Sequence, residues 1–414
     1  MTVRACGVAQ LNLGPIPAKR FRCAGIFCLM RAWRKPFDDQ GIEPTRSRRS
    51  TVNHGTCVSR QENRMSLNAP LSGIHIVEFE GLGPGPLAGW MLAGMGARIT
   101  LVARPSGRTS APDALRARDG DLLREGKTIV ELDLKAPAGR DAALDLIAQA
   151  DALIEGLRPG VMERLGLGPD ACARRHPKLV YGRMTGWGQD GPLAAAAGHD
   201  LNYVALTGLL SLSAPRDGRP GVPPTVVGDA GGALGLAFGI VCALLDVRGG
   251  GPGRVVDGAI VDIVSMLGSL ALWARANGQL DGAQPSLFHD APFYDVYRCA
   301  DGECVTIGAL EPPFYALLVE RLGLTDVDPA SQYDRARWPA LKARFAEVFA
   351  QRPSAHWRAL LEGTDACFAP VLSVADAAVH PHNAARGIYR TDERGNVRAK
   401  VAPRFLPLAG DETD

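Results

Sequence analysis

The chain has 414 residues and a formal net charge of +2, with 46% hydrophobic and 22% charged residues. This composition is typical of a folded enzyme and excludes a largely disordered chain. The near-neutral charge argues against nucleic acid as the main partner. Residues 230–245 form the longest uncharged apolar run. They fall short of the roughly 20 residues that span a bilayer, so we predict a buried helix and no membrane partner.

The charge is distributed unevenly along the chain. Residues 1–64 carry 12 Lys or Arg and 4 Asp or Glu, a local net charge of +8. Residues 1–65 are therefore predicted to be a basic N-terminal extension. Three alternatives remain open: read-through upstream of a start at Met65, a disordered tail, or an organelle-targeting segment. None of the nine cysteines forms a CxxC pair, so we predict no metal site, no disulfide framework and a cytoplasmic location.

After the extension, short apolar runs alternate with helical patterns. Residues 73–79 predict a buried strand, 81–86 a turn, 87–95 a helix and 97–103 a second strand, which is one βαβ unit. The alternation continues with strands 128–134, 152–155 and 179–184 and with helices at 139–150, 230–245 and 261–276. A parallel sheet covered by helices is the natural packing for this order, so the fold class is α/β.

The pattern changes near Gly278. Residues 293–298 and 304–308, with a turn at Asp301-Gly302, predict an antiparallel hairpin. Helices at 313–322, 336–350 and 355–362 and a strand at 368–372 follow. The predicted organisation is a large domain over 66–260, a helical linker over 261–292 and a smaller α+β domain over 293–384.

The segment Gly81-x-Gly-x-Gly follows the first strand, as a dinucleotide-binding turn would. Pro84 and Pro86 remove two N–H donors that a phosphate cradle would use. Arg104 ends the second strand, where a nucleotide-binding protein has an acidic residue, and arginine suits a phosphate. The alternatives are a phosphate site and a tight turn with a surface arginine.

Two residues are candidate proton carriers. His199, in Gly198-His-Asp-Leu-Asn-Tyr203, stands at a predicted helix start and is either a general base or a locally bonded helix-start histidine. Asp229, in Val227-Gly-Asp-Ala-Gly-Gly232, is either a helix N-cap or a carboxyl group in a partly desolvated pocket. In the second case, the following backbone N–H groups are candidates to face a developing oxyanion.

Four further charged residues have two interpretations each. Glu311 opens Glu311-Pro-Pro-Phe-Tyr315 and is either a helix-terminus charge or a site residue. Arg158 and Arg164 surround Pro159-Gly160, and Lys135 ends Leu132-Asp-Leu-Lys135. These three are either surface charges or a phosphate-binding patch.

Together these segments resemble the α-methylacyl-CoA racemases, a branch of the family III CoA-transferase superfamily. The resemblance covers about residues 69 to 405. The matching strings are Gly81-Leu-Gly-Pro-Gly-Pro86, Leu132-Asp-Leu-Lys135, Arg158-Pro-Gly-Val-Met-Glu-Arg-Leu-Gly-Leu-Gly168, Met184-Thr-Gly-Trp-Gly188, Gly198-His-Asp-Leu-Asn-Tyr203, Gly228-Asp-Ala-Gly-Gly232, Ala291-Pro-Phe-Tyr294 and Gly308-Ala-Leu-Glu-Pro312.

The resemblance implies a Rossmann-like large domain, completed by about residues 385–414, and an interlocked homodimer. It implies that His199 and Asp229 are the paired acid and base, and that Glu311 of a second copy orients His199. It assigns binding of the CoA thioester to Leu82, Arg104, Leu132, Asp133, Leu134, Lys135, Arg158, Arg164, Gly198, Asp200, Leu201, Asn202 and Tyr203. One string departs from the family: Phe288-His289-Asp290 stands where Asp-Gly-Gly is usual, near the expected acyl pocket.

The implied activity is a racemase that inverts the α-carbon of 2-methyl-branched acyl-CoA thioesters by two-base proton transfer through an enolate. No cofactor is required, because CoA is carried as part of the substrate. One alternative is a CoA-transferase of the same fold with Asp229 as the nucleophile. Another is a non-catalytic acyl-CoA-binding protein.

Overall fold

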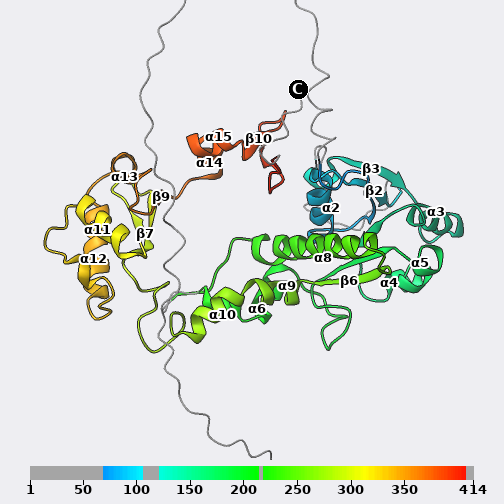
Figure 1. Ribbon diagram of the computed structural model, residues 1–414, viewed down its shortest axis with the longest axis horizontal. Helices are drawn as coiled ribbons and strands as arrows, with labels where there is room; N and C mark the ends of the chain where they lie inside the picture. Colours follow the sequence, from blue (N-terminus) through cyan, green and yellow to red (C-terminus); the bar gives the residue numbers. More distant parts are fainter. Residues whose placement is uncertain (1–68, 106–120, 214–217, 407–414) are drawn as a thin grey trace, which may run out of the picture. The chain divides into compact units, whose positions relative to one another are not determined.

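The structure, a computed structural model, describes residues 69–105, 121–213 and 218–406 (Figure 1). The chain divides into two compact units, Met1–Cys57 and Val58–Asp414. The first unit and the predicted N-terminal extension lie outside the described residues. All statements below concern the second unit.

Six strands form one parallel sheet in the order β3-β2-β1-β4-β5-β6, which confirms the predicted α/β class. The strands are β1 (His75–Phe79), β2 (Arg98–Ala103), β3 (Lys127–Glu131), β4 (Ala152–Glu155), β5 (Val180–Thr185) and β6 (Arg254–Ala259). The strand order reverses direction between β1 and β4. In doubly wound sheets a ligand crevice lies outside the carboxyl ends of the strands at such a point.

Helices cover both faces of this sheet. The helices of this part of the chain are α2 (Pro84–Gly94), η2 (Leu122–Arg124), α3 (Pro137–Ile147), α4 (Val161–Arg164), α5 (Pro169–Arg175), α6 (Asp200–Leu206), α7 (Leu209–Leu212), η3 (Val226–Ala230), α8 (Gly231–Arg248), α9 (Ile260–Leu267) and α10 (Ser269–Ala276). Alternate residues of β1 enter different cores: Ile76 packs in the core that contains α2 and α8, and Val77 packs in the core that contains α3 and α5. This is the period of two that a strand covered on both faces requires.

The long apolar helix α8 is buried on one face only, so the prediction of a buried helix is half right. Leu236 and Ile240 pack into the core beside β5 and β6, whereas Leu234 and Phe238 are exposed. The segment Val226–Arg248 is long and apolar enough to span a membrane, a test that core helices also pass. Figure 1 shows α8 running beside β6, as a core helix of this fold does.

A second group of elements has its own core. Its antiparallel sheet contains β7 (Tyr294–Arg298), β8 (Cys304–Gly308) and β9 (Phe368–Pro370), as the hairpin pattern predicts. Its helices are α11 (Pro312–Arg321), η4 (Pro329–Ser331), α12 (Trp338–Phe349) and α13 (Ser354–Leu361). Phe293 anchors the core by edge-to-face contacts with Tyr315 and Trp338. The predicted linker over 261–292 is helical only as far as Ala276. Residues 277–292 form turns, bends and irregular backbone.

The last described elements are α14 (Val374–Val379), α15 (Pro381–Arg386), β10 (Tyr389–Thr391) and β11 (Val397–Ala399). Arg390 and Arg398 pair with Glu125, which follows η2. Val401 lies so close to Gly94 of α2 that a β-carbon there would be 2.4 Å from its side chain. The end of the chain therefore contacts the first part of the parallel-sheet domain.

Candidate active site

The loops after β1 and β4 lie next to the point where the strand order reverses. The first contains Gly83, whose φ of 67° is a conformation that glycine adopts without strain. A β-carbon on Gly83 would lie 3.3 Å from Oδ2 of Asp229, so the Asp229 carboxyl lies directly against this turn. Two segments separated by more than a hundred residues thus meet at the predicted site.

Asp229 is not a helix N-cap, which was one of its two interpretations. It lies inside η3, a single π-helical turn, and α8 begins two residues later with no side-chain cap. Such turns occur often at functional sites. Thr225, immediately before η3, has a φ of 60°, which is costly for a residue with a branched β-carbon. Asp229 is therefore held in an irregular backbone rather than used to start a helix.

Asp200 holds this irregular turn in place. Its buried carboxylate accepts hydrogen bonds from the N–H of Asp229 at 2.7 Å and the N–H of Thr225 at 3.3 Å. Gly228 leaves the necessary room, because a β-carbon there would lie 2.3 Å from Oδ1 of Asp200. The N–H of Ala230 is bonded to the carbonyl of Thr225. The expectation that the N–H groups after Asp229 face an oxyanion is therefore wrong for Ala230.

His199 immediately precedes α6 and is exposed to solvent. Its backbone N–H donates to Oδ1 of Asn202 at 3.1 Å, so Asn202 fixes the start of the helix. Burial raises the pKa of the Asp229 carboxyl, the charge of Asp200 raises it further, and nearby His199 lowers it. The imidazole of His199 thus lies within electrostatic range of a carboxyl group whose pKa is raised, as the two-base hypothesis requires.

Tyr203 and Trp187 form a wall next to these groups. Their rings meet edge to face with centroids 4.7 Å apart, and the Tyr203 hydroxyl donates to the carbonyl of Gly198. Gly186 is required here, since a β-carbon would lie 2.0 Å from the Tyr203 ring. Burial raises the pKa of Tyr203, the charge of Asp229 adds to this, and Arg158 opposes it. Tyr203 therefore lies within electrostatic range of both Asp229 and Arg158.

The residues expected to bind CoA follow successive strands of the sheet. Arg104 follows β2, and its N–H donates to Glu80 at 3.0 Å. Residues 132–135 form a turn rather than the predicted end of a strand, because Oδ1 of Asp133 accepts the N–H of Lys135. Leu82 follows β1, and the other expected residues lie after β4, at α4 or around the start of α6; Leu82 and Leu201 are exposed. Carboxyl ends of parallel strands share one edge, so these loops face the same side of the sheet.

The loop that carries Arg158 is held by an ion-pair network that the sequence did not indicate. Arg183, buried on β5, donates to Glu155 at 2.9 Å and to Glu163 at 2.8 Å. The second oxygen of Glu155 accepts the N–H of Leu157 at 2.8 Å. An acidic residue at the end of β4 was visible in the sequence, but its partner on the next strand was not.

Glu311 belongs to the second group of elements rather than to the parallel-sheet domain. It precedes α11, makes no side-chain capping bond there, and its charge raises the pKa of Tyr333 and Cys367. Within the described ranges, no hydrogen bond or ion pair joins it to His199. The single chain therefore brings His199 and Asp229 together, but not Glu311.

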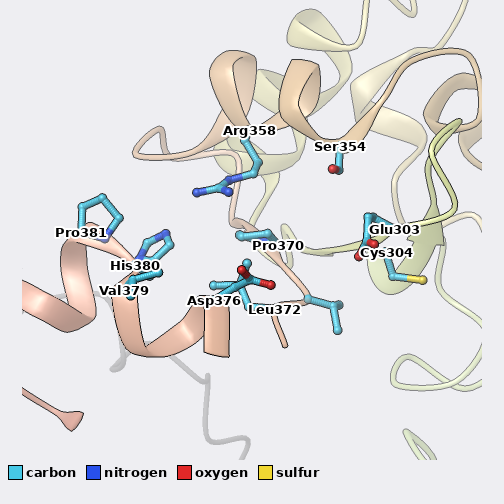
Figure 2. Close-up of a pocket in the computed structure, with 11 residues that line it drawn as sticks. Glu303, Cys304, Ser354, Arg358, Pro370, Leu372, Asp376, Val379, His380 and Pro381 are labelled. Carbon is cyan, nitrogen blue, oxygen red and sulfur yellow. The ribbon is translucent and has the colours of Figure 1, made fainter. Parts of the chain in front are cut away.

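A separate pocket of about 310 Å³ lies beside β8, β9 and α14 (Figure 2). Its basic side chains, Arg358 and His380, both contact the carboxylate of Glu362, at 2.9 and 2.7 Å. None of the predicted site residues lines it. Because Glu362 already pairs with both basic side chains, this pocket is a poorer candidate for an anionic thioester than the groups around Asp229. The part of the chain that the structure describes contains no cluster of metal-ligating side chains.

Comparison with known proteins defines the class. A model of CoA-transferase family III matches residues 71–413, and the chain belongs to this family. A crystal structure of a CAIB/BAIF family protein from Brucella suis superposes with a TM-score of 0.68 at 26% identity, covering 82% of this chain and 93% of that chain. The resemblance found in the sequence is confirmed.

Within this family, the chain is similar to both racemases and CoA-transferases. The α-methylacyl-CoA racemase of Homo sapiens is 41% identical over 346 residues, covering 81% of this chain and 86% of the relative. The mouse racemase is 40% identical over 343 residues, covering 80% and 86%. An acetyl-CoA:oxalate CoA-transferase of Acetobacter aceti is 30% identical over 340 residues, covering 77% and 85%.

Proposed function

We propose that this protein is an isomerase, an α-methylacyl-CoA racemase that inverts the α-carbon of 2-methyl-branched acyl-CoA thioesters. The observation that carries the proposal is the coupling of His199 to an Asp229 carboxyl whose pKa is raised by burial. The 41% identity to a relative that bears this name supports the same activity.

The chemistry requires two groups that serve opposite faces of one carbon. The α-hydrogen of a thioester is a weak acid, so a positioned base removes it and an enolate forms. A second, protonated group then returns a proton from the other side. Burial makes the Asp229 carboxyl a weaker acid, and we propose that it and His199 share one proton between them. Each acid or base role is worth about 10²–10⁴-fold in rate.

CoA enters as part of the substrate, and we propose no other cofactor. The loop residues Arg104, Lys135, Arg158 and Arg164 provide cations on the carboxyl edge of the sheet, where a CoA phosphate would be recognised. Residues 132–134, Leu82 and the start of α6 complete the proposed thioester site. The Phe288-His289-Asp290 string leaves the acyl chain itself open.

We also propose an interlocked homodimer in which Glu311 of the second copy reaches His199. The support is a set of exposed apolar side chains on two helices that both contact α9: Leu234 and Phe238 on α8, and Leu270 and Trp273 on α10. Large exposed apolar surface marks protein–protein contacts. The boundaries of the large domain, linker and small domain, and a cytoplasmic location, belong to the same proposal. The five described cysteines are all free, as in a reducing compartment.

A second function, CoA transfer, has one observation in its favour, the 30% identity to a CoA-transferase. In that reaction the Asp229 carboxylate attacks the thioester. A carboxyl group whose pKa is raised is less available as a nucleophile at a given pH, and a transferase needs no base at His199. These points favour the racemase.

The test is a panel of pure (2R)- and (2S)-methylacyl-CoA thioesters incubated in deuterated water. A racemase forms the opposite epimer and places deuterium on its α-carbon. A transferase moves CoA to a carboxylic acid acceptor, leaves the α-hydrogen in place and accumulates a hydroxylamine-sensitive acyl-enzyme. Binding without any turnover would instead support a non-catalytic acyl-CoA-binding protein.

A further inference from the structure

A fully buried ion pair lies beneath the turn that contacts Asp229. Glu78 is on β1, Lys127 is at the start of β3, and their side chains are 1% and 0% exposed. Nζ of Lys127 lies 2.8 and 2.6 Å from the two carboxylate oxygens of Glu78. Glu78 follows Ile74 and Ile76 on the same face of the strand, so the charge stands in an otherwise apolar row.

The third contact of Lys127 joins this pair to the site. Nζ donates to the carbonyl of Pro86 at 2.9 Å, in the first turn of α2. The ammonium therefore has a partner for each of its three donors. The start of α2 has no side-chain cap, since Gly83 offers no capping bond, and its first turn has no acidic residue.

The helix backbone also rests directly on the pair. A β-carbon on Gly89 of α2 would lie 1.8 Å from Oε2 of Glu78 and 3.1 Å from Nζ of Lys127. Any other residue at this position would push the helix off the pair. At its N-terminal end, α2 begins next to Gly83, which lies against the Asp229 carboxyl, and the helix packs on η3 and α8. The position of α2 on the sheet thus determines the position of one wall of the site.

We propose that Glu78 and Lys127 are positioning residues of the reaction site: by holding the first turn of α2 on the sheet, they keep Gly83 in place against Asp229. Neither residue touches the proposed substrate, and neither was singled out by the sequence. The kinetic test of this proposal, through kcat and KM, rests on the proposed function. The structural test, through amide hydrogen exchange, does not.

Lys127→Met is the cleanest perturbation. It removes the bond to Pro86 without leaving a lone buried charge, because burial already raises the pKa of Glu78 to about 7 and the loss of the ammonium raises it further. We expect kcat for α-hydrogen exchange to fall tenfold or more, while KM for the thioester stays within threefold. Asp246→Asn, which breaks an exposed ion pair with Arg254 at the end of α8, is the matched control and should leave both constants unchanged.

A second pair of variants tests the contact between Gly89 of α2 and the carboxylate of Glu78. Gly89→Ala alone and Glu78→Asp alone should each lower kcat, by collision in the first case and by retraction of the carboxylate in the second. Combined, the shorter acid leaves room for the added methyl group, so the double variant should recover part of the lost kcat. Losses in kcat that simply add in the double variant would contradict the steric contact between Gly89 and Glu78.

Amide hydrogen exchange tests the positioning role of Glu78 and Lys127 independently of the racemase activity. In Lys127→Met and in Gly89→Ala, the amides of residues 81–89 should exchange faster, and those of α11 should not change. A wild-type chain that never exchanges the α-hydrogen would refute the racemase and leave this readout intact. Unchanged amide exchange at 81–89, or kcat within twofold of wild type in both folded variants, would overturn the positioning role.

Discussion

Asp200→Ala should lower kcat strongly although it replaces neither of the two proposed proton carriers, His199 and Asp229. The substitution removes the acceptor of the Asp229 N–H at 2.7 Å and of the Thr225 N–H at 3.3 Å. Both bonds hold the π-helical turn that presents Asp229. Without them, the strained backbone at Thr225 is free to relax and to move the carboxyl group away from the substrate.

The magnitude follows from the shorter bond. A hydrogen bond to a charged acceptor contributes about 1.5–3 kcal/mol. If the whole free energy of this bond stabilises the transition state, its loss lowers kcat about 10- to 150-fold, since about 1.4 kcal/mol corresponds to a factor of ten. The longer bond to Thr225 adds little, because its donor–acceptor distance is at the weak end of the range.

The assay is deuterium incorporation at the α-carbon of one pure 2-methyl epimer, measured across pH. Asp200→Asn is the control, because it keeps an oxygen for the Asp229 N–H but removes the charge. That charge raises the pKa of Asp229, so its loss lets the carboxyl ionise at lower pH. The limb of the rate profile that is set by ionisation of Asp229 should therefore move to lower pH. A kcat within twofold of wild type in Asp200→Ala would refute the positioning argument.

Three further outcomes follow from the same structure. Arg104→Ala should raise KM for the thioester about tenfold with a smaller effect on kcat, from the loss of a charge-assisted bond of about 1.5–3 kcal/mol; unchanged affinity for free CoA would make Arg104 a surface charge. A truncated chain beginning at Met65 should keep full activity, and a large fall in its melting temperature would show that the extension packs on the core. Glu155→Gln should lower the free energy of unfolding by about 2–4 kcal/mol, because Arg183 loses a buried partner but keeps Glu163, and an unchanged urea midpoint would contradict this.

The fold was predictable where local pattern alone determines it. The apolar runs at β1, β2 and β4 are buried on both faces, and such strands are recognised without knowledge of their neighbours. The C-terminal end of β3 was not predictable, because Leu132 and Leu134 continue the alternation. The chain turns there only because Asp133 bonds the backbone of Lys135.

The structure brings together His199 and Asp229, which the sequence had singled out, and adds supporting residues that the sequence did not indicate. His199 and Asp229 stood out through their glycine-rich surroundings and the resemblance. The π-helical turn did not, since an aspartate before two glycines and an apolar run equally predicts a helix cap. The roles of Asp200 and Glu78 depend on partners 29 and 49 residues away, which no local pattern encodes.

The central claim, that His199 and Asp229 serve opposite faces of one carbon, is tested most directly by following each epimer separately in the two single variants. In deuterated water, His199→Ala and Asp229→Asn should both abolish inversion. Each should retain slow exchange of the α-hydrogen on the face that the surviving group serves, so the two variants should exchange opposite epimers. Exchange of the same epimer by both variants, or inversion that survives in either, would contradict the two-base account.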